Sequence, residues 1–355
     1  MCPPGVDQTT RTAQRWNILV PTLEQKQELL LEPGYEHRYT LTQEFLEEQW
    51  SFNAFERLFV QPKTNKNERV KPCVIDAVNE AMRSTKQSPF ELLPTEMFHV
   101  VLNEGCLDKE DIVALGCCST TTWDMVKPYI VADCKRNRVS WAGKPLLCSG
   151  TWLTKPPPAL FELFPEQKEK ENEWKTGPRQ HWRGYGPGMC PARRWNWGAI
   201  SSLQNVQNFD ATQQWMSAIT AWSQKGVKQS DLIKKDLTRA LQTSLGYRSG
   251  HWILRNYTLK IYVGVETAIA NDGIVRATIL GRRDLSLDMA LLIRICWGDT
   301  PLRDDENALA GFGKGIWAGH CFDVVLAGEP DCDTNFRDVT KALIRNVESV
   351  FKILR

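Results

Sequence analysis

Three side chains that could act together as base, nucleophile and acid stand close together near the C-terminal end of the chain. They are His320, Cys321 and Asp323. A thiol becomes a catalytic nucleophile when a base lies within hydrogen-bond reach and a third group orients that base. An enzyme would therefore require these three side chains to converge on one pocket, and this is the enzymatic hypothesis that the sequence leaves open.

Other signatures of catalysis and cofactor binding fail at specific positions. The run Gly311–Gly315 resembles a phosphate-binding loop, but that motif needs glycine where Ala308 stands and serine or threonine where Gly315 stands. A dinucleotide-binding fingerprint that began at Gly311 would need glycine at Ile316. No Gly-x-Ser-x-Gly or His-Glu-x-x-His sequence occurs. We therefore expect a protein without catalytic residues and without a cofactor.

The cysteines do not have the spacing of a metal site. None of the 11 is followed by another cysteine three positions later, the spacing that zinc sites favour. The adjacent pair Cys117 and Cys118 has diverging side chains, and no two of the five histidines are four residues apart. The sequence therefore predicts no metal site, and the cysteines are expected to be free thiols.

A segment of interleaved arginines and aromatic residues, at 178–198, is the best candidate for a surface that binds a target protein. Arginine and aromatic side chains dominate the hot spots of protein interfaces, and they also stack on unpaired bases. A buried tryptophan cluster covered by arginine stems is a further interpretation. The candidate target-binding residues are Arg179, Trp182, Arg183, Tyr185, Arg194 and Trp195.

Composition limits the classes of partner. The 355 residues include 44 Lys and Arg against 42 Asp and Glu. This near balance of charge argues against a protein that binds nucleic acid through bulk charge. No apolar stretch approaches the ~20 residues of a membrane span, and the N-terminus has no apolar signal core. We therefore expect a protein of the cytoplasm or the nucleus, with enough apolar residues for roughly two domains.

Periodicity and turn residues predict an α+β protein. Residues 1–88 are expected to form a helical N-terminal extension and residues 89–135 a group of two or three short helices. Residues 136–355 are expected to form a mixed domain with a mainly antiparallel sheet, flanking helices and a core of its own. Within it, strands are predicted at 252–265, 274–280, 289–297 and 322–326, and helices at 230–245 and 336–354.

The 89–135 segment resembles an F-box. The family pattern Leu-Pro-x-Glu followed by Leu-x-x-x-Asp and an apolar residue, with a later tryptophan, is matched in order by Leu93, Pro94, Glu96, Leu107, Asp111, Ile112, Leu115 and Trp123. Helices this short bury too little apolar surface to stand alone, so the segment needs a partner in its own chain or in another.

Later motifs resemble those that follow the box in fungal F-box proteins. Trp141-Ala142-Gly143 is such an element, and a second Trp-Ala-Gly sequence occupies 317–319. Two further motifs similar to those of the family begin at Trp252 and Arg294. Both Trp-Ala-Gly elements are also what a structural turn requires, with a buried tryptophan and a glycine that permits the bend.

The resemblance implies a non-catalytic adaptor. The box would bind a Skp-type adaptor and, through it, the cullin of a cullin–RING ubiquitin ligase, while residues 136–355 would hold an unknown target protein. The alternative is a stand-alone binding or regulatory protein whose vestigial box packs on residues 21–85. The expected adaptor-binding residues are Leu93, Pro94, Met97, Val101, Leu107, Ile112, Leu115 and Trp123.

Overall fold

The computed structural model describes nine segments of the chain. They are residues 16–29, 52–61, 92–150, 203–206, 209–225, 229–270, 275–297, 315–328 and 335–354. The predicted target-binding residues at 179–195 lie outside these segments. All statements below concern the described residues.

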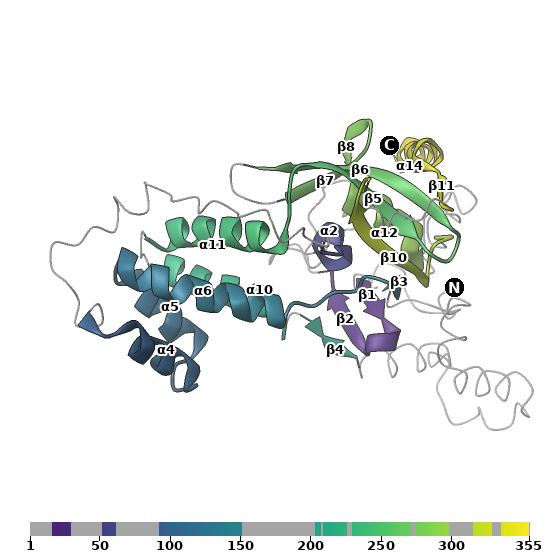
Figure 1. Ribbon diagram of the computed structural model, residues 1–355. Coiled ribbons are helices and arrows are strands. Elements are labelled where there is room, and N and C mark those ends of the chain that lie inside the picture. The colour runs from purple at the N-terminus through teal and green to yellow at the C-terminus, as the bar shows by residue number, and fades with distance from the viewer. Residues whose placement is uncertain are drawn as a thin grey trace, which may run out of the picture.

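A mainly antiparallel sheet forms one part of the molecule, which we call the sheet unit (Figure 1). Its strands follow the order β4-β2-β1-β3-β10-β5-β6-β7-β8, with β11 beside β6 and β9 beside β3. The parallel pairings β2–β4, β3–β9 and β6–β11 are only two residues long. The predicted α+β class is confirmed. The strands are β1 Trp16–Val20, β2 Gln25–Glu28, β3 Lys144–Gly150, β4 Gln204–Asn205, β5 Gly250–Asn256, β6 Ile261–Ile269, β7 Val275–Ile279, β8 Arg282–Ser286, β9 Cys296–Trp297, β10 His320–Leu326 and β11 Arg337–Asp338.

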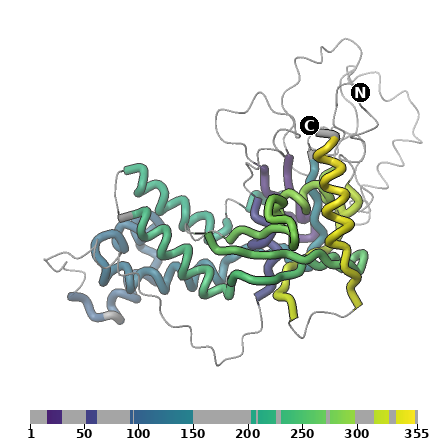
Figure 2. Tube along the Cα trace, turned by 90° about the horizontal axis from the view of Figure 1, so that it is seen from above, coloured from purple at the N-terminus to yellow at the C-terminus, as the bar shows by residue number. Residues whose placement is uncertain are grey.

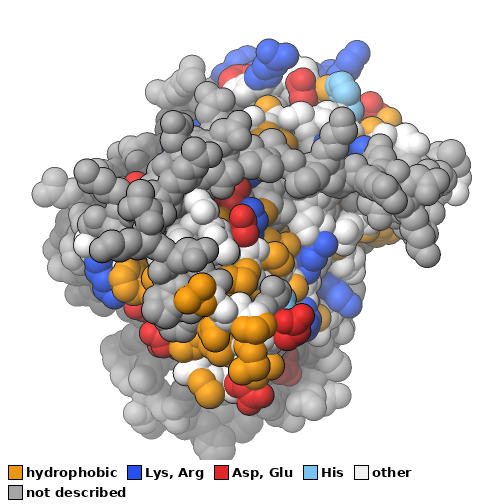
Figure 3. All heavy atoms as spheres, turned by 60° about the vertical axis from the view of Figure 1, so that its left-hand side comes forward, with side chains coloured by type: hydrophobic (Ala, Val, Ile, Leu, Met, Phe, Trp, Pro, Cys, Tyr) orange, Lys and Arg blue, Asp and Glu red, His pale blue; other side chains and the backbone are white. Residues whose placement is uncertain are grey.

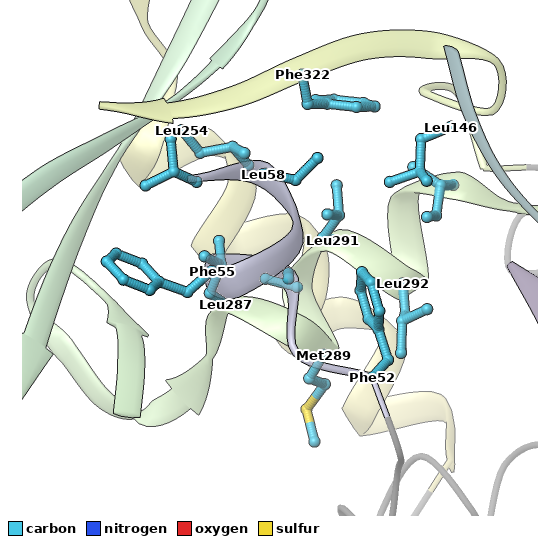
Figure 4. Close-up of a cluster of buried hydrophobic side chains, with 14 of the residues drawn as sticks. Phe52, Phe55, Leu58, Leu146, Leu254, Leu287, Met289, Leu291, Leu292 and Phe322 are labelled. Atoms are coloured by element: carbon cyan, nitrogen blue, oxygen red, sulfur yellow. The ribbon is translucent and has the colours of Figure 1, made fainter. Parts of the chain in front are cut away.

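Two helices bury their side chains against the sheet. They are α2 (Ala54–Leu58) and α12 (Leu287–Ile295), which carry Phe55, Leu58 and Leu291 to the centre of the core. Figure 4 shows these side chains beneath Leu254 of β5 and Phe322 of β10. The short 3-10 helix η2 (Pro21–Leu23) joins β1 to β2. This sheet core holds the strands together because it removes the inner faces of β5, β6 and β10 from water.

The last helix, α14 (Thr340–Leu354), lies along the sheet unit, as Figure 2 shows. The sequence predicts a stripe of buried apolar residues here, and Phe336, Leu343 and Val347 are all buried in the structure. Val350 is half-buried and packs against the same core. The predicted amphipathic helix is therefore confirmed, although it begins at Thr340 rather than at 336.

Five helices form a second part, the helical unit, which projects from the sheet unit in Figures 1 and 2. They are α4 Thr95–Asn103, α5 Lys109–Cys117, α6 Thr120–Arg136, α10 Ala211–Gln224 and α11 Gln229–Leu245. Apart from Leu245 at the end of α11, which belongs to the sheet core, their buried apolar side chains make a core of their own. Gly246 follows α11 with φ of 82°, a left-handed conformation that glycine adopts without strain, so the predicted end of this helix is confirmed.

The predicted boundary between residues 89–135 and 136–355 does not separate two independent units. Helices α10 and α11 lie beyond position 136, yet their Trp215, Ile219 and Leu237 are buried in one core with the box helices. The box segment is too small to bury its own apolar faces, and α10 and α11 cover them. The helical unit is therefore discontinuous in sequence.

Two predicted elements are wrong, and β1 and α12 were mistaken for a common reason. The helical extension predicted for residues 1–88 contains strands β1 and β2, and the strand predicted at 289–297 is mostly helix α12. All five residues of β1 are buried, and so are seven of the nine in α12. An element that is apolar on every side has no polar face, so its periodicity cannot distinguish a strand from a helix. For α12, a local signal settles the type: the hydroxyl of Ser286 caps the helix by accepting from the Met289 N–H at 3.2 Å.

One acidic side chain near the boundary of the two units makes folding depend on pH. Burial raises the pKa of the Glu56 carboxyl, against the lowering effect of Arg57 and Arg138. A raised pKa in the folded state means that the ionised carboxylate opposes folding above the ordinary glutamate pKa of about 4.3. Glu56→Gln is therefore expected to melt at a higher temperature than the wild type at pH 8, and the difference should vanish near pH 4.

Thermal melts of both proteins across this pH range measure the effect. Glu104, an exposed glutamate of the helical unit, provides the matched control, since Glu104→Gln should leave the melting temperature unchanged at every pH. An equal or lower melting temperature for Glu56→Gln at pH 8 would contradict the prediction.

Candidate docking face on the helical unit

Helix α4 presents apolar side chains to solvent as well as to the core. Pro94 precedes its first turn as the N-cap residue, and Glu96 lies in that turn, where a negative charge suits the positive end of the helix dipole. Phe98 and Leu102 point inward and are 1% exposed. Met97 and Val100 point outward and are 53% and 48% exposed. The helix therefore has two apolar faces, and among the residues that the structure describes, side chains cover the face of Phe98 and Leu102.

The outward side chains extend into a small apolar patch, the α4 face, which we define as Leu92, Pro94, Met97 and Val100. Leu92 precedes the helix and is 70% exposed, the largest value among the exposed large apolar residues described. In Figure 3, hydrophobic side chains gather low on the surface of the molecule, at the height where α4 lies in Figure 1. A cluster of exposed apolar side chains is typical of an interaction surface.

Acidic side chains are exposed beyond the C-terminal end of α4. Glu104, Asp108 and Glu110 are exposed on the loop between α4 and α5 and in the first turn of α5. Asp108 and Asp111 form a capping box at the start of α5, with the Asp111 N–H donating to Asp108 Oδ1 at 2.8 Å. In return, the Asp108 N–H donates to Asp111 Oδ2 at 3.4 Å, so both carboxylates serve the start of this helix.

The eight predicted adaptor-binding residues divide into three groups in the structure. Pro94 and Met97 are exposed, while Leu93, Val101 and Leu107 are half-buried. Ile112, Leu115 and Trp123 are 3%, 8% and 1% exposed and belong to the core of the helical unit. The last three therefore cannot contact a partner in this conformation, which corrects the prediction. The sequence pattern marks them as apolar but does not tell whether another chain or α10 and α11 cover them.

Tryptophan hydrogen bonds attach the box helices to α10 and α11. The indole N–H of Trp123 in α6 donates to Asp236 Oδ2 of α11 at 2.8 Å, and the Lys127 ammonium lies 3.0 Å from the same oxygen. The indole N–H of Trp215 in α10 donates to Asp133 Oδ2 of α6, also at 2.8 Å. Buried polar groups are stable only when they are paired, so these contacts fix the helices in one arrangement.

A third indole makes a similar contact at the far end of the unit, where Trp222 of α10 donates to the carbonyl oxygen of Glu110 in α5 at 3.1 Å. The participation of α10 and α11 was missed in the sequence analysis. The signal that could have found it is the helical spacing of Trp215, Ile219 and Trp222 in α10, repeated by Ile233, Leu237 and Leu241 in α11. The box therefore packs on α10 and α11 of its own chain, and the described residues within 21–85, at 21–29 and 52–61, contribute nothing to this core.

The three candidate catalytic residues do not converge. His320, Cys321 and Asp323 lie on β10, where successive side chains point to opposite faces of the sheet. The His320 imidazole contacts Asn256, with Nδ1 3.0 Å from the amide nitrogen. On the other face, Asp323 accepts two hydrogen bonds from Arg255, at 2.9 and 2.7 Å, and one from the Tyr257 hydroxyl at 2.7 Å. These contacts make Asp323 a structural ion-pair partner, so the three residues do not form one site.

The two Trp-Ala-Gly sequences are equivalent turns in the structure. Trp141 and Trp317 are buried, and Gly143 and Gly319 have φ of 71° and 83°. Each turn leads into one of the antiparallel strands β3 and β10, and each glycine N–H donates to the opposite strand, from Gly143 to Phe322 O at 2.7 Å and from Gly319 to Leu146 O at 2.8 Å. The turns therefore fix the register of this strand pair, as the structural interpretation of the motif predicts.

No helix in the described segments is long and apolar enough to cross a membrane. Within the same segments, no group of three or more His, Cys, Asp and Glu side chains could hold a metal ion. Comparison with known proteins found no matching family model, no matching curated protein and no matching solved structure.

Proposed function

We propose that the protein is an F-box-type adaptor that links a target protein to a cullin–RING ubiquitin ligase. The observation that carries this proposal is the α4 face, whose four apolar residues are exposed while Ile112, Leu115 and Trp123 of the same box are buried. A Skp-type adaptor would cover this face, and a cullin would join through that adaptor. Such a protein acts in the cytoplasm or the nucleus.

The apolar side chains of the α4 face would supply most of the affinity. Burial of a methionine side chain contributes about 1.5–3 kcal/mol, which corresponds to about a 10- to 100-fold change in affinity. Glu104, Asp108 and Glu110 are exposed, so their charges would add little to affinity. Exposed charges of this kind influence the rate of association and the choice of partner. An unknown target would bind elsewhere on the chain.

A stand-alone binding protein is the second candidate. The burial of Ile112, Leu115 and Trp123 in the chain's own core favours it, because these residues then need no partner. The two candidates differ at the α4 face. An F-box-type protein would bind its Skp-type partner through this face, whereas in a stand-alone protein the face would stay exposed to solvent.

The test is a pull-down of the Skp-type adaptor with the Met97→Glu variant. Met97 is exposed, so we expect an unchanged melting temperature and at least a tenfold loss of adaptor binding. The matched control is Leu259→Glu, because Leu259 is 47% exposed on the sheet unit, away from α4, and should retain binding. Failure of the wild-type protein to bind any Skp-type adaptor would refute the proposal in favour of the stand-alone protein.

A further inference from the structure

The helical and sheet units meet through a small set of contacts. Four connections along the chain join the two units, at 59–94, 137–143, 206–210 and 246–249. The two hydrophobic cores share no residue, and the apolar contact between the units comes from Leu245, the last residue of α11, and the neighbouring Tyr247, which both belong to the sheet core. Polar contacts around the short helix α2 lie at this junction, which Figure 1 shows between α10 and the sheet.

One carboxylate at the junction serves both units. Asp210 is the N-cap residue of α10, and its Oδ1 accepts from the Gln213 N–H at 3.1 Å. Its Oδ2 pairs with the guanidinium of Arg57, which belongs to α2 in the sheet unit. The two side chains are 3% and 8% exposed, so water screens this ion pair little. The start of α10 is therefore held directly against α2.

Arg57 is itself fixed by neighbours on the connection between α6 and β3. Its guanidinium carbon lies 5.3 Å from the ring centroid of Trp141, and its Nη1 donates to the Val139 carbonyl oxygen at 3.4 Å. The backbone N–H of Trp141 donates in turn to the Arg57 carbonyl oxygen at 2.7 Å. These contacts leave the arginine one direction in which to point, toward Asp210.

A second cation attaches the same helix to the connection that follows α6. Arg138, two residues after the end of α6, donates through Nη2 to the carbonyl oxygens of Glu56 and Phe59, at 2.9 and 3.0 Å. These carbonyls belong to the C-terminal part of α2, where a positive charge is favoured. A single attachment would allow rotation about itself, whereas two separate attachments on one helix prevent it.

We infer that the Arg57–Asp210 pair, with Arg138, fixes the orientation of the helical unit relative to the sheet unit. Arg57, Asp210 and Arg138 are positioning residues. They touch no part of the α4 face, and they determine where that face points relative to the rest of the chain. This inference goes beyond the proposed function and holds for any partner of the α4 face.

Distance measurement between the two units tests the inference on the full chain. Spin-labelled non-canonical amino acids at Lys235 of α11 and Arg345 of α14, both exposed, leave the eleven cysteines untouched. Pulsed electron paramagnetic resonance should give one narrow distance distribution for the wild type. Arg57→Met keeps the length of the side chain and removes the charge, and it should at least double the width of the distribution while far-UV circular dichroism stays unchanged.

The matched control is Arg282→Met, which removes exposed ion pairs to Asp284 and Glu348 within the sheet unit and should leave the width unchanged. If Arg57→Met does not fold, Asp210→Asn decides by the same measurement, because asparagine still caps a helix. A distribution as narrow as that of the wild type in the deciding variant would overturn the inference. Loss of fold in both variants would also overturn it, because the pair would then be required for folding rather than for orientation.

Discussion

A fragment of residues 136–355 is expected to aggregate when it is expressed alone. It retains α10 and α11 but lacks α5 and α6, so Trp215, Ile219 and Leu237 would lie in water. It also lacks β1 and α2, which supply Ile18 and Phe55 to the sheet core. Each of these side chains stabilises the protein by about 1.5–3 kcal/mol when buried. Their combined loss is comparable with the 5–15 kcal/mol that stabilises an ordinary domain.

Co-expression of residues 1–135 as a separate chain provides the control. That chain carries β1, α2, α4, α5 and α6, so it should restore solubility by completing both cores in trans. Size-exclusion chromatography of the fragment with and without its complement measures the result. A monodisperse 136–355 fragment with a cooperative melt would show that it holds a complete core of its own.

Leu343→Asp should abolish cooperative unfolding of the sheet unit. Leu343 is 2% exposed on α14 and packs into the sheet core. The substitution leaves a cavity, which costs about 2–5 kcal/mol for a leucine, and it places an unpaired carboxylate in apolar surroundings. Together these effects approach the whole stability of a domain. Near-UV circular dichroism and a thermal melt should show loss of fixed tertiary packing.

Two observations separate this result from general unfolding. Ala342→Asp adds the same carboxylate at the preceding position, which is exposed. Its free energy of unfolding should stay within about 0.5 kcal/mol of the wild-type value, as is usual for surface substitutions. No residue of α14 belongs to the core of the helical unit, so Leu343→Asp should keep the α4 face and its binding. An unchanged melting temperature for Leu343→Asp would mean that α14 does not stabilise the sheet unit.

The candidate site was predictable in its position but not in its composition. The Leu-Pro segment and the capping residues Asp108 and Asp111 act within a few residues, so the start of α4 and the start of α5 can be read from the chain. Whether an apolar residue of the box faces a partner or its own core depends on what packs against it. That difference separates Met97 from Ile112, and it lies in the distant helices α10 and α11.

The sequence by itself determined the α+β class, the box helices, the C-terminal end of α11, the apolar stripe of α14 and the two Trp-Ala-Gly turns. In each case the deciding interaction is local: a cap, a left-handed glycine, or a stripe that repeats every three or four residues. Only the tertiary structure decided that β1 is a strand, that Asp323 pairs with Arg255, and that α10 and α11 complete the box. These features depend on contacts between residues far apart in the chain. A segment that is buried on every side, or a face that could be covered equally by its own chain or by another, carries no local pattern from which its partner can be read.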